Sequence, residues 1–364
     1  MKKVLISGYY GFDNSGDDAI LKAIVKDLKA NDSSIQITAF SNNPPFTKKI
    51  YGIEAVYRFG MLDIIRAIRD CDLFISGGGS LLQDVTSTRS LLYYLSLIKL
   101  AKMFNKPVMV YANGIGPINR RVNRYITRNV LNKVDLITLR DEDSRKFVEE
   151  IGVSNKNVYV TADPVFTLQP TREETIERIL EREGIMDDKP LVGVSVRNWT
   201  NGDNLVQVLA KAIDYIIDRY GVNVVLIPMH YPEDISISRD ILNRVTKEGC
   251  YIISNKYNVE DIMGIINRLE IIIAMRLHSL IYAATQYVPM VGIVYDPKVE
   301  GFLKTLEMEH MCPAEGIEYN QLIKNIDYVW EKRKDLGKRL MELDKKMREG
   351  ALKNVFFALD LLKK

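Results

Sequence analysis

Short apolar runs alternate with amphipathic segments along almost the whole chain, and this alternation limits the fold more than any other feature. In the first half, six such runs predict strands: Val4–Ser7, Ile35–Phe40, Leu73–Ser76, Val108–Ala112, Leu136–Leu139 and Val158–Thr161. Five segments between them predict helices: Ala19–Ala30, Leu62–Arg69, Leu91–Met103, Arg121–Leu131 and Asp141–Ile151. Strands that are buried on both faces read as continuous aliphatic runs, and helical crossovers join parallel strands. The first half therefore predicts a parallel, doubly wound α/β sheet.

The same pattern restarts after a charged helix predicted at Thr171–Gly184. The stretch PLVGVSVR opens a second series, whose further strands are predicted at Val222–Pro228, Tyr251–Ile253, Ile271–Ala274 and Met290–Val294. Helices are predicted between them at Leu205–Arg219, Ile235–Glu248, Val259–Asn267 and Leu280–Gln286. A chain of 364 residues exceeds what one hydrophobic core usually supports. We expect two Rossmann-like domains, over residues 1–168 and 190–325, a linker region over 169–189, and a helical tail over 326–364 that packs back on the first domain.

Composition excludes several classes of protein. The net charge of +3 is too small to suggest a nucleic-acid partner. The three cysteines, Cys71, Cys250 and Cys312, are scattered, so neither a disulfide framework nor a metal site is predicted, and a reducing compartment fits best. The longest apolar stretch is interrupted by Arg276 and His278, which argues against a transmembrane helix. We therefore expect a cytoplasmic, enzyme-sized protein without a bound metal.

The loop GYYGFDNSGDDAIL (Gly8–Leu21) joins the first predicted strand to the first helix. Asn14 or Ser15 suits a helix cap, and Asp17 in the first turn would complement the helix dipole. This interpretation leaves the long glycine-rich approach to the helix unexplained. The loop matches neither a dinucleotide-binding motif nor a P-loop. Its acidic residues suit a polyol, because carboxylates accept hydrogen bonds from hydroxyl groups. Asn14 and Asp17 are therefore predicted to bind a polyol ligand, with Asp17 as a candidate base.

Two further glycine-rich stretches follow predicted strands. SGGGSLLQD places Gly77, Gly78 and Gly79 at an expected helix start. A turn needs one such glycine or two, so three favour a ligand that lies against the bare main chain. YANGIGP, which contains Asn113, follows another strand in the same way. We predict that the three glycines and Asn113 also contribute to the polyol site.

An arginine and an aspartate follow the last strands of the first half. In LRDEDS, Arg140 either pairs with the neighbouring acids or points into a binding cleft, and the spacing favours neither alternative. In TADPVF, Asp163 precedes a proline, which is typical of a structural turn.

The most informative stretch is IIIAMRLHSLIYAA, residues 271–284. A predicted buried strand leads through Arg276, His278 and Ser279 directly into a helix, whose free N–H groups attract anions. Arg276 and His278 are two residues apart, so in extended backbone they share one side. A fixed cation, a titratable proton carrier and a helix start together predict an anion site. Arg197 and Lys298 follow other predicted strands of this half and are candidates for further cations, with a solvated surface lysine as the alternative for Lys298.

Six of these motifs occur in the order seen in a known family. From Lys3 to about Phe302 the sequence resembles the bacterial polysaccharide pyruvyl transferases, and it looks closest to the branch that acts on secondary cell-wall polysaccharide. The resemblance implies a GT-B-like fold, in which two Rossmann-like domains face a cleft. It also implies that the donor-binding arginine and histidine of the family's R-L-H motif fall on Arg276 and His278. The arginine of the family's L-R-D motif falls on Arg140.

The family resemblance implies an activity and its substrates. The donor is phosphoenolpyruvate, no cofactor is needed, and the product is a 4,6-linked pyruvate ketal on a sugar. In the branch that the chain resembles, the acceptor is N-acetylmannosamine in a lipid-diphosphate-linked precursor, and the product helps to anchor surface-layer proteins. We therefore expect the first domain to bind the acceptor and the second to bind the donor, at the inner face of the cell membrane.

The chemistry of phosphoenolpyruvate suits the candidate residues. His278 is the expected general acid that protonates C3, since imidazole titrates near neutral pH. Arg276, Arg140 and Lys298 would hold the dianion and stabilise charge on the leaving phosphate. Asp17 would take the proton of a sugar hydroxyl.

Two rival interpretations stay open. A nucleotide-sugar glycosyltransferase shares the GT-B fold, and Glu260 and Asp261 leave room for a ribose-binding carboxylate. A non-catalytic polysaccharide-binding protein is the other alternative, but the presence of Arg276, His278 and Arg140 together argues against it. The basic segment at residues 119–133 and the basic tail are candidate contacts with an anionic membrane surface. The sequence leaves an oligomer possible.

Overall fold

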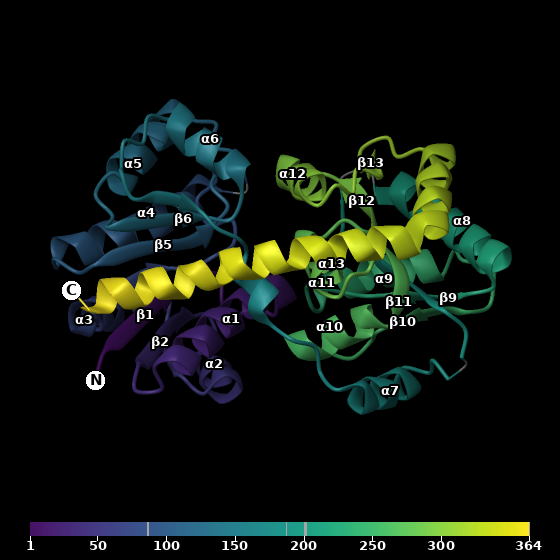
Figure 1. Ribbon diagram of the computed structural model, residues 1–364, viewed down its shortest axis with the longest axis horizontal. Helices are drawn as coiled ribbons and strands as arrows, with labels where there is room; N and C mark the ends of the chain where they lie inside the picture. The colour runs from purple at the N-terminus through teal and green to yellow at the C-terminus, as the bar shows by residue number, and fades with distance from the viewer. Residues whose placement is uncertain (86, 187, 200–201, 364) are drawn as a thin grey trace. The chain divides into compact units, whose positions relative to one another are not determined.

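The computed structural model describes residues 1–85, 87–186, 188–199 and 202–363 (Figure 1). Residue 187 of the expected linker and residue 364 of the tail lie outside the described residues. The chain forms two compact units: unit 1 comprises Met1–Leu168 and Lys346–Lys364, and unit 2 comprises Gln169–Lys345. Each unit contains one sheet, so the two are described separately.

Unit 1 holds a seven-stranded sheet in the order β3-β2-β1-β4-β5-β6-β7. Its strands are β1 (Lys3–Ser7), β2 (Gln36–Ser41), β3 (Glu54–Tyr57), β4 (Leu73–Ser76), β5 (Val108–Asn113), β6 (Leu136–Leu139) and β7 (Val158–Val160). Its helical segments are α1 (Ser15–Asn31), α2 (Pro44–Tyr51), α3 (Met61–Asp70), α4 (Thr88–Met103), α5 (Arg121–Leu131), α6 (Glu142–Glu150) and the 3-10 helix η1 (Pro164–Thr167). All neighbouring strands are parallel. The strand order reverses between β1 and β4, and ligands of such sheets bind beyond the carboxyl ends at this point.

Unit 2 holds a six-stranded parallel sheet in the order β10-β9-β8-β11-β12-β13. Its strands are β8 (Leu191–Ser195), β9 (Asn223–Leu226), β10 (Cys250–Ile252), β11 (Leu269–Ala274), β12 (Met290–Val294) and β13 (Met311–Pro313). Its helices are α7 (Glu173–Arg182), α8 (Gly202–Tyr220), α9 (Glu233–Leu242), α10 (Val259–Asn267), α11 (Leu277–Thr285), α12 (Pro297–Thr305) and the start of α13 (Tyr319–Lys363). The order reverses between β8 and β11. The predicted fold class, an α/β protein with two doubly wound parallel sheets, is confirmed.

The last part of α13 belongs to unit 1, where it packs beside β7. The Oγ1 of Thr161 donates to Oδ1 of Asn354 at 2.9 Å, and Nδ2 of Asn354 donates to the carbonyl of Ala162 at 3.1 Å. The rings of Tyr159 and Phe357 stack with their centroids 4.8 Å apart. These polar and aromatic contacts join Lys346–Lys364 to the end of the first sheet.

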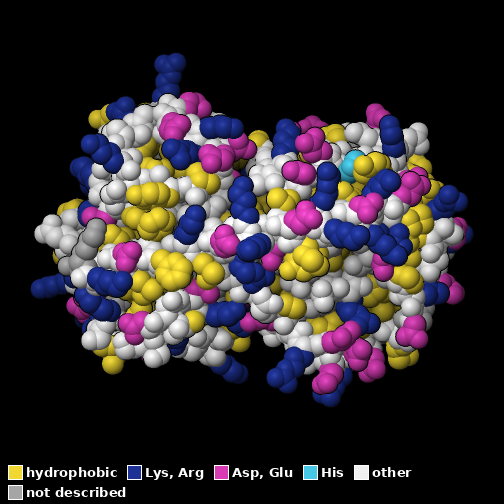
Figure 2. All heavy atoms as spheres, in the orientation of Figure 1, with side chains coloured by type: hydrophobic (Ala, Val, Ile, Leu, Met, Phe, Trp, Pro, Cys, Tyr) yellow, Lys and Arg dark blue, Asp and Glu magenta, His cyan; other side chains and the backbone are white. Residues whose placement is uncertain are grey.

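Charges of both signs are interspersed over the face shown in Figure 2, in keeping with the net charge of +3. None of the helices in the described ranges is long and apolar enough to cross a membrane.

Candidate functional site

The carboxyl edge of the second sheet carries the predicted anion-binding side chains. In the register of this sheet, Ala274 at the end of β11 lies beside Ser195 of β8 and beside Gly292 of β12. Because the three strands are parallel neighbours, the loops that follow them all begin at the same edge of the sheet. The structure therefore gathers there the loops that carry five predicted residues: Arg197, Arg276, His278, Ser279 and Lys298.

Arg276 is held by a carboxylate that the sequence analysis missed. Its Nε donates to Oδ2 of Asp234 at 3.0 Å, and its Nη2 pairs with Oδ1 of the same side chain. Asp234 is 1% exposed and also accepts from the backbone N–H groups of Met229 and His230, at 3.2 and 3.0 Å. The bidentate pair fixes the plane of the guanidinium. The Nη1 group of Arg276 forms no hydrogen bond with the described residues, so it can donate to a ligand.

The start of α11 differs from the extended segment expected at this place. Arg276 is the N-cap residue, with extended backbone, but His278 already lies in the first turn of the helix. The strand-like alternation that was expected to place both side chains on one side is therefore wrong. No side chain caps α11, and the first helical N–H bond is that of Leu280 to the Arg276 carbonyl. The predicted helix N-terminus is thus present without a side-chain cap, and Oγ of the buried Ser279 donates to the Arg276 carbonyl at 2.6 Å.

The two other predicted cations of this edge differ in their surroundings. Lys298 lies at the start of α12, with its Nζ 3.1 Å from Oδ2 of Asp296, which also caps the helix. Arg197 lies over the ring of Tyr295, with Cζ 5.3 Å from the ring centroid, and Trp199 packs against the same ring at 5.4 Å. Aromatic contact leaves the positive charge of Arg197 unneutralised, whereas Lys298 has a carboxylate partner.

The residues that were predicted to bind a polyol all belong to unit 1. Oδ1 of Asn14 accepts from the N–H of Gly16 at 3.1 Å and caps α1, so the cap prediction is confirmed for Asn14. Asp17 and Asp18 lie in the first turn. The structure brings Asp17 to the triple glycine, because a Cβ atom added at Gly79 would lie 3.3 Å from Oδ1 of Asp17.

The triple glycine does not start a helix, contrary to expectation. It continues β4 as a loop, and α4 begins only at Thr88. A Cβ atom at Gly77 would collide with the hydroxyl of Tyr10, and one at Gly78 would lie 3.0 Å from Ile20. Tyr10 is fully buried, and burial raises its pKa well above the usual value of 10.0, with Asp17 as a further cause. Close packing of the protein itself therefore explains two of the three glycines.

Asn113 holds the glycine loop in place. It is fully buried at the end of β5, and its Nδ2 donates to the carbonyl oxygens of Gly77 and Ser76 at 2.5 and 3.2 Å. The N–H of Gly114 donates to the Gly79 carbonyl at 2.9 Å. Asn113 thus fixes the position of the glycine loop by hydrogen bonds, and its role in ligand binding stays a prediction.

Arg140 lies in unit 1 and pairs with the neighbouring acids, which was one of its two predicted alternatives. Its Nη1 lies 3.5 Å from Oδ2 of Asp163, its Nε 3.4 Å from Oδ2 of Asp141, and its Nη2 donates to Ser80 at 3.0 Å. A Cβ atom at Gly114 would lie 2.7 Å from Nη2, so the guanidinium packs directly on that glycine. Asp163 caps η1, as its predicted turn requires, and burial raises its pKa although Arg140 opposes the shift.

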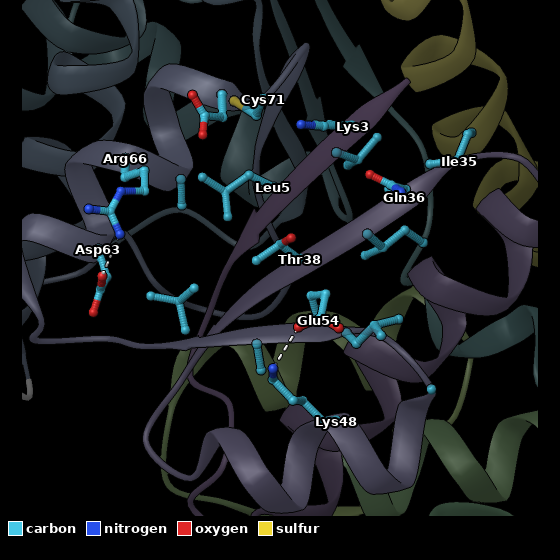
Figure 3. Close-up of a pocket in the computed structure, with 18 of the residues that line it drawn as sticks. Lys3, Leu5, Ile35, Gln36, Thr38, Lys48, Glu54, Asp63, Arg66 and Cys71 are labelled. Atoms are coloured by element: carbon cyan, nitrogen blue, oxygen red, sulfur yellow. Dashed lines mark hydrogen bonds and ion pairs between the residues drawn. The ribbon is translucent and has the colours of Figure 1, made fainter. Parts of the chain in front are cut away.

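A hollow of about 890 Å³ opens elsewhere in unit 1, beside the amino-terminal parts of β1 and β2 and along the whole of β3 (Figure 3). The residues that line it include Lys3, Leu5, Gln36, Thr38 and Glu54. The predicted ligand-binding loops begin at the opposite, carboxyl ends of the strands, so the hollow has no part in the candidate site. Within the described ranges, no group of three or more His, Cys, Asp or Glu side chains forms a candidate metal site.

Several known proteins are similar to this chain. The amylovoran biosynthesis protein AmsJ of Erwinia amylovora is 22% identical over 367 residues, covering 85% of this chain and 87% of that protein. Among solved structures, Anabaena HepE in complex with UDP-glucose is similar with a TM-score of 0.68 at 12% identity, over 100% of both chains. The UDP-GlcNAc 2-epimerase of Neisseria meningitidis, bound to UDP-GlcNAc, is similar with a TM-score of 0.68 at 13% identity, again over 100% of both chains.

These structural similarities establish a GT-B-like fold and nothing about the ligand. The profile of the polysaccharide pyruvyl transferases matches residues 14–297, a range that includes the candidate side chains of both units except Lys298. The match spans most of the chain and contains the triple glycine, Arg140 and the Arg276–His278 pair. The chain therefore belongs to the polysaccharide pyruvyl transferase family.

Proposed function

We propose that the protein transfers the pyruvyl group of phosphoenolpyruvate to a sugar, where two hydroxyl groups form a cyclic ketal and phosphate is released. The observation that carries this proposal is Arg276, fixed by the buried Asp234 at the uncapped start of α11, next to His278. A rigid guanidinium with a free N–H group and the helix N–H groups suit a small dianion. The match of this region to the pyruvyl transferase profile supports the same donor.

The proposed reaction needs one proton donor and one proton acceptor. His278 gives a proton to C3 of phosphoenolpyruvate, and a sugar hydroxyl oxygen bonds to C2. The bond from C2 to the phosphate oxygen then breaks, and a second hydroxyl oxygen bonds to C2 and closes the ketal. Of the two hydroxyl protons, one restores His278 and the other leaves with phosphate. Asp17 in unit 1 is the proposed base that first takes the second of these protons from the hydroxyl group and then passes it to the phosphate, so Asp17 ends the reaction ionised.

The donor carries a phosphate and a carboxylate, so its binding needs several positive groups. We propose that Arg276, Arg197, Lys298 and the first N–H groups of α11, including that of Ser279, supply them. The π faces around Arg197 leave its charge available, and the charge that develops on the leaving phosphate would be stabilised by the same groups. Arg140 is also proposed to bind the donor. The donor would have to compete with Asp141 and Asp163, which already pair with Arg140.

The proposed acceptor is N-acetylmannosamine of a lipid-diphosphate-linked precursor of secondary cell-wall polysaccharide, pyruvylated at its 4 and 6 hydroxyl groups. The acceptor would bind unit 1 at Asp17, Asn14, Asn113 and the glycines 77–79, and the enzyme would work at the inner membrane surface. The modified polysaccharide would help to anchor surface-layer proteins. The similarity to AmsJ, a protein of amylovoran biosynthesis, supports a polysaccharide acceptor in general.

The test is phosphate release from phosphoenolpyruvate by the purified protein. We expect release that depends on an N-acetylmannosaminyl glycoside, together with a ketal product detected by mass spectrometry. No release with any saccharide acceptor would overturn the proposal. UDP-glucose serves as the comparison ligand, because HepE was solved with it. Thermal stabilisation by UDP-glucose but not by phosphoenolpyruvate would instead favour a nucleotide-sugar glycosyltransferase.

A further inference from the structure

The loop between β1 and α1 is longer than a helix cap requires, and its aromatic residues explain the extra length. Tyr9 and Phe12 stack face to face, with ring centroids 4.0 Å apart and planes 5° from parallel. Between them, Gly11 has a φ of 77°, a left-handed conformation that glycine adopts without strain. A Cβ atom there would also lie 2.6 Å from the backbone nitrogen of Asn43. The turn at Gly11 thus brings the two rings together.

Arg58, directly after β3, organises a larger aromatic cluster around this pair. Its Cζ lies within 6 Å of five ring centroids: Tyr9 at 5.9 Å, Phe12 at 5.1 Å, Phe59 at 5.2 Å, Tyr93 at 4.8 Å and Tyr94 at 5.7 Å. We call these five rings and Arg58 the aromatic cluster. Arg58 is 5% exposed, and its hydrogen bonds go to the Gly8 carbonyl and the Tyr94 hydroxyl at 3.4 and 3.3 Å.

The positive charge of Arg58 is balanced mainly by aromatic faces. No carboxylate of the described residues lies within ion-pair distance of it, and its Nε has no hydrogen-bond partner among them. Cation–π attraction increases when the cation is removed from water. The hydroxyl of Tyr93 adds a 2.7 Å hydrogen bond to the Arg58 carbonyl. The guanidinium therefore holds the surrounding rings in fixed positions.

The outer rings of the aromatic cluster reach solvent. Phe59 is 58% exposed, and its ring centroid lies 5.7 Å from that of Tyr93 and 5.8 Å from that of Tyr57, which is 49% exposed. Tyr9 and Phe12 are half-buried. Adjacent exposed rings of this kind mark binding surfaces, whereas single exposed hydrophobic residues need no explanation. The cluster also lies near the carboxyl ends of strands of the first sheet: Tyr9 and Phe12 are on the loop from β1 to α1, and Phe59 follows β3.

We propose that the aromatic cluster is a subsite for a sugar ring of the saccharide acceptor, an inference that rests on the proposed function. A pyranose has a face of C–H groups and an edge of hydroxyl groups. The C–H face packs against the electron-rich face of an aromatic ring, and rings already held in place lose little entropy on binding. Asn14 at the end of that loop and Asp17 in the first turn of α1 carry side-chain oxygens that can accept from hydroxyl groups.

The experiment compares acceptors of two lengths in the phosphate-release assay: N-acetylmannosamine methyl glycoside and an oligosaccharide that ends in N-acetylmannosamine. We expect Phe59→Ala and Tyr9→Ala each to raise the KM for the oligosaccharide about tenfold. The KM for phosphoenolpyruvate should stay within about twofold, and Phe59→Trp should restore oligosaccharide binding. Leu62→Ala is the matched control, because Leu62 is 79% exposed and belongs to α3, outside the cluster.

Titration calorimetry of the oligosaccharide, with the full chain, separates failure of this inference from failure of the proposed function. If the wild type binds the oligosaccharide but transfers no pyruvyl group, the Phe59→Ala variant still tests the subsite by its weaker binding. Equal oligosaccharide affinity and KM in the wild type and both alanine variants would overturn the inference. Normal saccharide kinetics with loss of sedimentation on anionic vesicles would also overturn it and would assign the cluster to a lipid surface.

Discussion

Two arginines that pair with buried aspartates show how the neighbours of a side chain decide what it can still bind. Arg140 has partners for Nε, Nη1 and Nη2, two of which are carboxylates. Arg276 donates from Nε and Nη2 to a single carboxylate, and its Nη1 has no partner in the part of the chain that the structure describes. An incoming anion needs a free N–H donor as well as charge. Arg276 is therefore better suited than Arg140 to hold the donor.

The first prediction concerns Arg276 and His278. Arg276→Ala should lower kcat/KM for phosphoenolpyruvate by about 10²–10³-fold, because it removes a fixed positive group at the proposed phosphate site. His278→Ala should lower kcat by roughly 10²–10⁴-fold with a smaller change in KM, as expected for loss of a proton donor. Steady-state kinetics measures both. Arg276→Lys is the control that keeps a positive charge beside Asp234. Near-normal turnover in the two alanine variants would show that the donor binds elsewhere.

The second prediction concerns Asp27, a buried side chain of α1 that accepts from Oγ1 of Thr167 at 2.8 Å. Burial raises the pKa of Asp27 to about 6. The unfolded chain has a pKa of about 3.9 at this side chain, so the folded protein binds the proton more tightly. The stability that this protonation contributes is full below about pH 4 and is lost as the pH rises through about 6. Asp27→Asn should therefore gain stability relative to the wild type between pH 4 and pH 7, by up to about 3 kcal/mol.

Urea unfolding of the wild type and of Asp27→Asn, at pH 4 and at pH 7, measures this difference in the free energy of unfolding. Asp32→Asn is the control with the opposite sign, because hydrogen bonds from Ser34 lower the pKa of the exposed Asp32. An equal effect of Asp27→Asn at both pH values would mean that Asp27 titrates normally in the folded protein.

At the scale of helices and strands, every central strand was predicted, whereas two of the four edge strands were missed. The bounds of β4, α5, β6, α10 and β12 agree with their predicted ranges. Both missed strands, β3 and β13, lie at the edges of their sheets, where each buries a single side chain, Ala55 or Cys312. An edge strand lacks the continuous apolar run that identifies a central one. Helix α2 was missed because it begins at Pro44 and Pro45, a pair that is typical of turns but also suits the first helical positions.

The candidate site could be predicted only where local sequence determines it. The end of β11 and the start of α11 follow from an apolar run and a helix, so Arg276 and His278 could be found. The partner of Arg276 lies 42 residues away, on a helix after another strand, and no local pattern connects the two. The triple glycine was misread for the same reason, because its contacts come from Tyr10 and Ile20 on other segments.

The third prediction concerns the ion pair between Asp234 of α9 and Arg276, which follows β11. Asp234→Asn keeps an oxygen for the N–H groups of Met229 and His230 but loses the charge that fixes Arg276. The guanidinium should then sample several orientations, so the KM for phosphoenolpyruvate should rise about tenfold or more while kcat at saturation changes less. Kinetics over a range of donor concentrations measures this split.

Two variants separate positioning from a general loss of structure. Glu233→Gln removes the neighbouring carboxylate, which lies 3.5 Å from His230 rather than at Arg276, and should leave the KM unchanged. Asp234→Glu retains the charge and should recover part of the donor affinity. If Asp234→Asn lowers only thermal stability and leaves the KM for phosphoenolpyruvate intact, the pair is structural alone.

At the scale of the whole molecule, the proposed lipid-linked acceptor requires a protein surface that can bind to a membrane, since no helix in the described ranges could span one. The start of α5 offers one surface. Arg120 and Arg121 are exposed, and so are Val122 and Tyr125, at 68% and 60%. Exposed basic and apolar side chains on one helix are typical of surfaces that bind anionic lipids.

Arg124 lies in the same basic segment, but its guanidinium has partners within unit 1. Its Nη1 pairs with Glu150 at 2.8 Å, and its Nε donates to the Ile118 carbonyl at 2.6 Å. A guanidinium with these two partners ties α5 to the rest of unit 1. It should contribute to stability more than to lipid binding.

The last prediction is that neutralising Arg120 and Arg121 weakens binding to anionic vesicles. Each basic residue near such a surface contributes about 1 kcal/mol, so Arg120→Gln with Arg121→Gln should reduce the partition coefficient about tenfold or more at low salt, and high salt should remove the difference. Vesicle sedimentation measures the partition. The same variant should raise the KM for a lipid-linked acceptor and leave that for a soluble glycoside unchanged.

The control is Arg145→Gln with Lys146→Gln on α6, which removes two exposed charges from another helix and should bind vesicles like the wild type. Equal losses in both double variants would show that net charge, rather than the start of α5, determines membrane binding.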